Sequence, residues 1–237
     1  MNALILMTRI PVPGKTKTRL MDILSGEECA EIHKNFLKDL FSSCEKLKNK
    51  VDIYLTYTPE GKIFLIEDIL PEYIKLFPQQ GESLGDRMSN AIDKLLDEDY
   101  KKVVLIGSDI PELQPKDIEI AFNILEDNDI CLGPTSDGGY YLVGMKEIHS
   151  EIFCDNIAWG KKSVLEGTID IANRANLTVG LSEKHMDIDT KEDLLNFIKR
   201  IEEKKRSYEV FPHNTVNFLE KHSKRVRCQE VRSLFIK

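Results

Sequence analysis

Short runs of apolar residues alternate along this sequence with longer segments in which apolar residues recur at every third or fourth position. A continuous apolar run is typical of a buried strand, and the wider spacing is typical of a helix with one buried face. The runs predict strands at residues 3–7, 51–57, 74–77, 102–106, 130–132, 140–145 and 177–181. The spaced segments predict helices at residues 26–48, 83–96, 115–125, 161–175 and 189–201, with a further short helix near 214–222. Because strands and helices alternate and the strands are apolar throughout, the sequence predicts an α/β fold with a mostly parallel sheet and helices on both faces.

The predicted elements form one unit that ends near residue 204. The sequence up to that point shows no internal repeat and no low-complexity linker. Residues 205–237 carry eight basic and three acidic residues, in a chain whose net charge is −7. Such a tail either packs back onto the acidic body or binds an anionic partner, and we favour the first. We therefore expect a domain at residues 1–204 and a basic extension at 205–237.

Composition narrows the class of protein. Hydrophobic residues make up 41% and charged residues 31% of the 237 positions, which is typical of a chain with a packed core. No apolar run approaches the roughly 20 residues that a membrane-spanning helix needs. The five cysteines are scattered, without a CxxC pair, which argues against a zinc site and predicts a reduced, cytoplasmic protein. The negative net charge argues against nucleic-acid binding by the chain as a whole.

A basic loop follows the first predicted strand. Residues 8–20 contain two prolines, a glycine and four basic residues, of which the last three are spaced by two. Backbone N–H groups together with lysine and arginine make a good phosphate site, and ligands bind at the carboxyl ends of parallel strands. The loop is not a Walker A motif, because Arg9 stands where that motif requires a glycine. We expect phosphate binding here rather than a plain exposed loop, through Pro13, Gly14, Lys15, Lys17 and Arg19.

Aspartates follow several of the later predicted strands. Asp109 comes directly after the strand at 102–106, Asp137 lies in a glycine-rich loop, and Asp187 and Asp189 precede the last helix of the domain. Each has a structural alternative, since aspartate is common in turns, and Asp189 or the following threonine is a good helix N-cap. Opposite a phosphate, however, a carboxylate needs a bridging cation, and Mg²⁺ binds through one or two carboxylates plus phosphates. Together with the basic loop, these aspartates predict diphosphate chemistry assisted by Mg²⁺ or Mn²⁺.

Seven blocks of sequence carry a family resemblance. They are residues 11–14 (PVPG), 17–20 (KTRL), 80–88 (QGESLGDRM), 107–111 (GSDIP), 133–142 (GPTSDGGYYL), 159–160 (WG) and 187–190 (DIDT). Together and in this order they resemble the DUF2064 family, whose members are often labelled glycosyltransferases within the nucleotide-diphospho-sugar transferase superfamily. The resemblance runs from about residue 3 to residue 200 and leaves residues 205–237 uncovered. It implies a GT-A-like fold, in which a Rossmann-like sheet binds a nucleotide through a divalent metal ion.

The resemblance also implies roles for individual residues. Asp109 and Asp189 are similar to the metal-binding aspartates of the superfamily, and Asp187 is then a supporting carboxylate. The segment at 80–88 looks like a nucleotide-binding segment, although a serine N-cap explains part of it without any ligand. The implied nucleotide ligands in this segment are Gln80, Gly81 and Arg87. The implied acceptor-side residues are Asp137, Gly138, Gly139, Tyr140 and Trp159.

Two reactions fit these residues. In glycosyl transfer, the metal with Lys15 and Arg19 stabilises the departing nucleoside diphosphate, and Asp137 acts as the base for an acceptor hydroxyl. In nucleotidyl transfer, as in the 2-phospho-L-lactate guanylyltransferases of the same superfamily, an acceptor phosphate attacks the α-phosphate and pyrophosphate leaves. The charge of the loop favours the second reaction. The family label favours the first, and we take an NDP-sugar-dependent glycosyltransferase as the expected function.

A third alternative is a non-catalytic nucleotide-binding protein, against which the paired Asp109 and Asp189 argue. The expected partners are a nucleotide-activated donor and a small-molecule acceptor, without nucleic acid or a membrane span, and a homo-oligomer stays open. The histidines show no ligand spacing, so no role is assigned to His33, His149, His185, His213 or His222.

Overall fold

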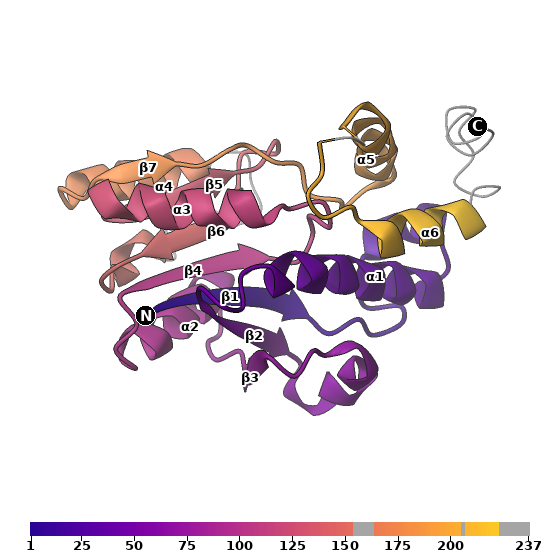
Figure 1. The fold of residues 1–237 in the computed structure, drawn as a ribbon, viewed down its shortest axis with the longest axis horizontal. Coiled ribbons are helices and arrows are strands. Elements are labelled where there is room, and N and C mark those ends of the chain that lie inside the picture. The colour runs from indigo at the N-terminus through magenta and orange to yellow at the C-terminus, as the bar shows by residue number, and fades with distance from the viewer. Residues whose placement is uncertain (154–163, 205–206, 223–237) are drawn as a thin grey trace.

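A seven-stranded, mostly parallel sheet forms the centre of the protein (Figure 1). The structure is a computed structural model that describes residues 1–153, 164–204 and 207–222. Within these ranges the strand order is β3-β2-β1-β4-β6-β5-β7, and β6 runs antiparallel to both of its neighbours. The strands are β1 (Asn2–Arg9), β2 (Asp52–Thr58), β3 (Ile74–Pro78), β4 (Lys102–Gly107), β5 (Ile130–Pro134), β6 (Tyr140–Met145) and β7 (Val179–Leu181). The predicted α/β fold with a mostly parallel sheet is confirmed.

Helices cover both faces of this sheet. Leu4 and Leu6 of β1 pack in one hydrophobic cluster with residues of α1 and α3, whereas Ala3 and Ile5 pack in another with residues of α2 and α4. This division follows from the alternation of side chains along a strand, which gives β1 two buried faces. The helices are α1 (Gly26–Glu45), α2 (Leu84–Leu96), α3 (Pro115–Asp127), α4 (Val164–Arg174), α5 (Lys191–Lys204) and α6 (His213–Lys221). None of the described helices has the length and hydropathy that a membrane span requires.

Local sequence explains where the main helices start. A reciprocal capping box opens α1, in which the Ser25 side chain accepts from the backbone N–H of Glu28 and the Glu28 carboxylate accepts from that of Ser25. Ser83 opens α2 in the same way, so the N-cap interpretation of that serine is confirmed. Pro115 stands in the first turn of α3, where its missing N–H costs little.

In the described ranges, four short 3₁₀ helices were not predicted from the sequence. They are η1 (Thr18–Asp22), η2 (Glu60–Leu65), η3 (Glu67–Ile69) and η4 (Ser150–Phe153). Segments of three to six residues are too short to show a repeating pattern of buried positions, which explains why the sequence pattern did not reveal them.

The described part of the predicted extension packs against the body. Phe218 and Leu219 of α6 lie in a third hydrophobic cluster with residues of α1 and α5, and α6 runs beside α1 (Figure 1). The buried carboxylate of Asp39, in α1, accepts hydrogen bonds from the backbone and side chain of both Asn214 and Thr215 at 2.6–2.9 Å. A carboxylate from one helix therefore satisfies N–H groups in the first turn of another.

Replacing Asp39 by Ala should destabilise the protein by about 2 kcal/mol, because buried donors of α6 lose their acceptor. Urea denaturation followed by circular dichroism measures the change. Asp170→Ala is a suitable control, since Asp170 is an exposed aspartate of a helix and its loss should cost less than about 0.5 kcal/mol. A free energy of unfolding equal to wild type in the Asp39 variant would show that these bonds contribute nothing.

The predicted functional segments meet at one edge of the sheet. This edge holds the carboxyl ends of β1, β4, β5 and β7 and, because β6 runs in the opposite direction, the start of β6. The basic loop leaves β1 here, Asp109 follows β4, Asp137 lies in the β5–β6 hairpin, and the segment at 187–190 follows β7. Ligands of α/β sheets bind at this edge, so the fold brings the candidate residues to the expected place.

Candidate functional site

A cavity of about 530 Å³ opens at the carboxyl edge of the sheet. Its volume lies within the range of small-molecule sites in proteins. Its walls come from the loop after β1, the start of α2, the end of β4, the β5–β6 hairpin and the segment at 187–189. Of the predicted site residues, those that line it are Lys15, Lys17, Arg19, Arg87, Asp109, Asp137, Gly139, Tyr140 and Asp189.

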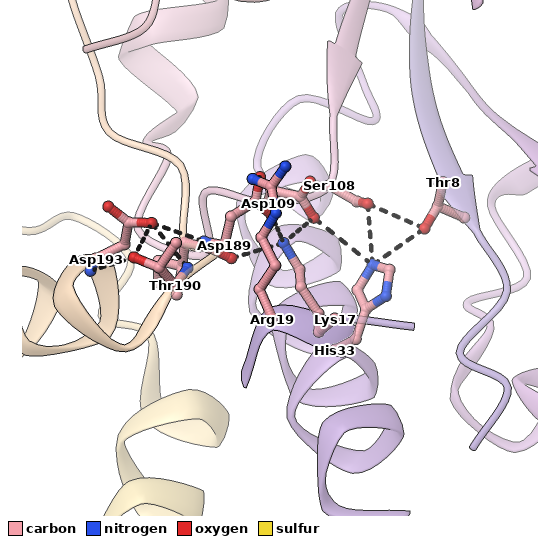
Figure 2. Close-up of polar contacts among 10 residues, drawn as sticks. Thr8, Lys17, Arg19, His33, Ser108, Asp109, Asp189, Thr190 and Asp193 are labelled. Carbon is pink, nitrogen blue, oxygen red and sulfur yellow. Dashed lines mark hydrogen bonds and ion pairs between the residues drawn. The ribbon is translucent and has the colours of Figure 1, made fainter. Parts of the chain in front are cut away.

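An ion-pair cluster of Lys17, Asp109 and Asp189 lies at the centre of the site (Figure 2). The Lys17 ammonium lies 2.8 Å from Oδ1 of Asp109 and 2.8 Å from Oδ1 of Asp189. Burial lowers the pKa of this ammonium, but the charges of the two aspartates outweigh that effect and hold the pKa above its ordinary value. For Asp109, desolvation raises the pKa of the carboxyl, but the charge of Lys17 outweighs it and holds the pKa below its ordinary value. The Asp109 carboxylate is therefore ionised at neutral pH beside a cationic lysine.

The environment of Lys17 differs from the one that the sequence predicted. The sequence predicted three similar basic side chains in one phosphate-binding loop, whereas the structure buries Lys17 against carboxylates and leaves Lys15 and Arg19 exposed. The backbone explains the difference, because Lys17 adopts a left-handed conformation with φ of 51° just before η1. Its side chain lines the cavity but ends between the carboxylates of Asp109 and Asp189.

The loop itself is held by internal hydrogen bonds. The Thr16 hydroxyl donates to the carbonyl of Ile10 at 3.2 Å and accepts from the N–H of Val12 at 3.1 Å. Gly14 has φ of 69°, a conformation that favours glycine. Pro13 and Gly14 do not line the cavity, so their contribution is to the shape of the loop.

A buried polar network lies behind Asp109, and the sequence analysis missed it (Figure 2). Nε2 of His33 lies 3.1 Å from the Ser108 hydroxyl and 3.3 Å from that of Thr8, and the two hydroxyls are 3.0 Å apart. Burial lowers the pKa of His33 to about 4, so the imidazole is neutral at neutral pH. Nε2 is also 4.0 Å from Oδ1 of Asp109. The signal was present, because His33 is a polar residue on the apolar face of the predicted helix at 26–48.

The residues of the segment at 187–190 make different contacts. Thr190 is the cap of α5, since its hydroxyl accepts from the N–H of Asp193 at 3.2 Å and the Asp193 carboxylate accepts from the N–H of Thr190 at 2.8 Å. Asp189 is therefore left to face Lys17 and, at 4.0 Å, Arg19. The N–H of Ile188 donates to the carbonyl of Asp109 at 2.9 Å, which joins the two acidic segments.

Negative charge accumulates on this side of the cavity. Burial, reinforced by Asp137, Asp189 and Asp109, raises the pKa of the Asp187 carboxyl to about 6. A bound cation would relieve the repulsion between the Asp187 carboxyl and these neighbours.

The glycine-rich hairpin holds Asp137 at the cavity wall. Oδ1 of Asp137 accepts from the hydroxyl of Thr135 and, at 3.0 Å, from the N–H of Gly139. Gly138 has φ of 92° and does not line the cavity. Trp159, the remaining predicted acceptor-side residue, lies outside the described residues.

The predicted nucleotide segment lies only partly at the cavity. Arg87 lines it, and its Nε donates to the carbonyl of Gly81 at 3.0 Å. Gly81 has φ of 126°, and a Cβ there would approach that of Asp86 to 2.6 Å, so the turn before α2 requires glycine. Gln80 is exposed and lies outside the cavity lining. The neighbouring Gln79 lines the cavity, with Nε2 bonded to main-chain carbonyls of both β1 and β2.

The donor set fits a divalent cation that brings ligands of its own. Among the residues that the structure describes, no three His, Cys, Asp or Glu side chains are grouped so as to hold a metal by themselves. Asp109 and Asp189 supply hard carboxylate oxygens, and Mg²⁺ commonly binds through one or two carboxylates, water and substrate phosphates. Metal binding at this pair stays a prediction, and it calls for a phosphate-bearing ligand.

Comparison with known proteins points to one group. A family model described as "Uncharacterized protein conserved in bacteria (DUF2064)" matches residues 31–161. The chain is 30% identical over 140 residues to the 2-phospho-L-lactate guanylyltransferase of Methanocaldococcus jannaschii, a match that spans 58% of each chain. It is 27% identical over 192 residues to the protein of that name from Methanocaldococcus sp. strain FS406-22, with 78% of each chain covered.

Solved structures agree on the fold. A protein of Desulfovibrio desulfuricans G20, provisionally named a nucleotide-diphospho-sugar transferase, matches with a TM-score of 0.84 and 28% identity over 96% of this chain and 99% of that one. A 4-diphosphocytidyl-2C-methyl-D-erythritol synthase from Anaerococcus prevotii matches with a TM-score of 0.57 and 12% identity over 85% and 96% of the two chains. The second likeness is one of fold alone.

Proposed function

Because the chain belongs to the DUF2064 family, whose model covers more than half of it, we propose that it is a nucleotidyltransferase with the fold of the nucleotide-diphospho-sugar transferases. In the proposed reaction, an oxygen of an acceptor phosphate attacks the α-phosphorus of a nucleoside triphosphate. The bond between the α-phosphorus and the bridging oxygen breaks, and pyrophosphate leaves. The relatives named for an activity are guanylyltransferases, so GTP is the first donor to test and 2-phospho-L-lactate the first acceptor.

The observation that carries this proposal is the charge of the cavity walls. The exposed basic residues Lys15 and Arg19 line the cavity together with Arg87 at the start of α2, and Asp109 and Asp189 line it next to Lys17 and Arg19. A triphosphate carries more charge than the diphosphate of a sugar donor, and a wall of exposed cations complements it.

The proposed roles follow from these positions. Lys15 and Arg19 bind the β- and γ-phosphates and stabilise the charge that develops on pyrophosphate as it leaves. Asp109 and Asp189 would hold Mg²⁺ or Mn²⁺, which supplies neutralisation of charge on the phosphate oxygens. Asp137 needs no role as a base in this reaction, because an acceptor phosphate is already ionised at neutral pH.

The relatives therefore favour the reaction that was the alternative in the sequence analysis, nucleotidyl transfer, over glycosyl transfer. One structural observation, the position of Asp137, still supports glycosyl transfer. Asp137 lines the cavity and is held by Thr135 and Gly139, which is a suitable place for a base that deprotonates an acceptor hydroxyl.

A pyrophosphate-release assay separates the two reactions. The full chain is incubated with Mg²⁺ or Mn²⁺, each of the four ribonucleoside triphosphates, and 2-phospho-L-lactate or another phosphorylated hydroxy acid. We expect release of pyrophosphate that requires the acceptor and is fastest with one triphosphate. Release of nucleoside diphosphate from an NDP-sugar, with no pyrophosphate from any triphosphate, would reject nucleotidyl transfer in favour of glycosyl transfer.

Ligand binding supplies a second readout, because a ligand of the native state raises the melting temperature by mass action. A shift with one triphosphate and not with its sugar conjugates supports the proposal. If no nucleotide shifts the melting temperature in the presence of metal, both transferase reactions are rejected.

A further inference from the structure

Lys17 has no hydrogen-bonding capacity left for a phosphate. A lysine ammonium has three N–H donors. Those of Lys17 face Oδ1 of Asp109 and Oδ1 of Asp189, each at 2.8 Å, and the carbonyl of Ile188 at 2.6 Å. Its side chain is 4% exposed, whereas that of Arg19, two residues further along the same loop, is 74% exposed. The two basic side chains of one loop therefore differ in what they can bind: Arg19 is open to a ligand, and Lys17 is bonded within the protein.

The Lys17 ammonium lies between the two proposed metal ligands. Asp109 and Asp189 come from segments 80 residues apart, and the ammonium contacts one oxygen of each. Two carboxylates brought so close repel one another unless a cation lies between them. A lysine supplies one positive charge in that position.

The surroundings fix Lys17 there. Its backbone is in the left-handed conformation, and its ammonium lies 5.6 Å from the centre of the Phe36 ring, on α1. The Thr16 bonds hold the loop just before it. The ammonium is thus held in contact with the Asp109–Asp189 pair before any ligand binds.

We propose that Lys17 is an internal counter-cation of the Asp109–Asp189 pair, and that it makes the protein take up a divalent cation together with the nucleotide and not before it. This inference rests on the proposed metal site. With the lysine in place, the pair carries a net charge of −1 instead of −2, which lowers its attraction for a free divalent ion. The phosphates of the nucleotide supply the missing negative charge and the missing ligands. Lys17 acts through the two aspartates, so it is a positioning residue and makes no phosphate contact.

Binding of Mn²⁺ without nucleotide tests this directly, by electron paramagnetic resonance of the unbound ion. Lys17→Met removes the charge and should tighten nucleotide-free Mn²⁺ binding at least tenfold relative to wild type. Lys15→Met, in the same loop but exposed, should leave that affinity within about twofold, because its charge is screened by solvent. The double variant K17M/D189N restores the net charge of −1 and should return the affinity to near the wild-type value.

Melting curves give the second readout and cover a variant that folds poorly. Mn²⁺ alone should raise the melting temperature of the Lys17→Met protein, or restore its fold, and should shift wild type only when GTP is also present. Equal Mn²⁺ affinity in wild type and Lys17→Met, with no stabilisation of the variant by Mn²⁺, overturns the inference. In that case, wild type that still binds Mn²⁺ with GTP keeps the proposed metal site. Failure of every protein to bind Mn²⁺ with GTP rejects the metal site, and the inference with it.

Discussion

Asp109→Asn will lower kcat/KM for nucleotidyl transfer by about 1000-fold, which corresponds to ~4 kcal/mol of transition-state stabilisation. The substitution keeps the size of the side chain and removes the charge that would hold a divalent cation at the end of β4. Steady-state assays of pyrophosphate release measure the effect. Far-ultraviolet circular dichroism should match wild type, because Lys17 keeps Asp189 and the carbonyl of Ile188 as partners.

The companion variant Asp137→Asn distinguishes the two transfer reactions. In nucleotidyl transfer no base is required, and kcat should fall by less than about tenfold. If Asp137→Asn is as damaging as Asp109→Asn, Asp137 takes part in the chemistry, and glycosyl transfer becomes the better reading. If Asp109→Asn keeps wild-type kcat/KM and an unchanged Mg²⁺ requirement, the metal assignment is wrong.

The second large effect concerns stability. Arg200→Met should destabilise the protein by about 4 kcal/mol, because it leaves the buried carboxylate of Glu112 without its counter-ion. The Arg200 guanidinium lies 2.6 Å from Oε1 of Glu112, whose side chain is 6% exposed. The same guanidinium contacts the sulfur of Met186 at 3.1 Å, next to the acidic segment at 187–189. Losing Arg200 therefore removes both a buried ion pair and a support of the site.

Thermal melting should show a fall of roughly 10 °C for this variant at neutral pH. Burial raises the pKa of Glu112, and without Arg200 that pKa rises further, so the folded state of the variant binds a proton more tightly than the unfolded state. The deficit should then shrink as the pH falls and grow as the pH rises through the folded-state pKa. The double variant E112Q/R200M should recover part of the loss. A pH-independent deficit under 1 kcal/mol would show that the pair is not a significant source of stability.

The arrangement of strands and helices was predictable because burial leaves a clear trace in this sequence. Strands such as β1 and β4 are apolar on both faces, and helices such as α1 repeat apolar residues at helical spacing with capping residues at the start. The described 3₁₀ helices left no comparable trace, since each spans only one or two turns. The sequence pattern thus revealed the strands and the longer helices and missed the short 3₁₀ helices.

The site was predictable as a location more than as a set of contacts. Parallel strands predicted that the basic loop, Asp109 and Asp189 would meet at one sheet edge, and they do. The difference between Lys15 and Lys17 was hidden, because alternating basic residues look alike in a sequence although the structure buries only the Lys17 side chain. The choice between Asp189 and Thr190 as N-cap also needed coordinates, since either side chain can cap a helix.

The contact of Lys17 with Asp109 and Asp189 also has a consequence for how the protein is made. Lys17 leaves the ribosome 92 residues before Asp109, and Asp109 leaves it 80 residues before Asp189. The three-way ion pair can close only when the last of them has emerged, so Lys17 waits for one of its two carboxylates until residue 189 has been made. A product cut short before residue 189 would lack one of the two carboxylates that Lys17 bridges. An activity built on this pair would then require synthesis at least as far as residue 189.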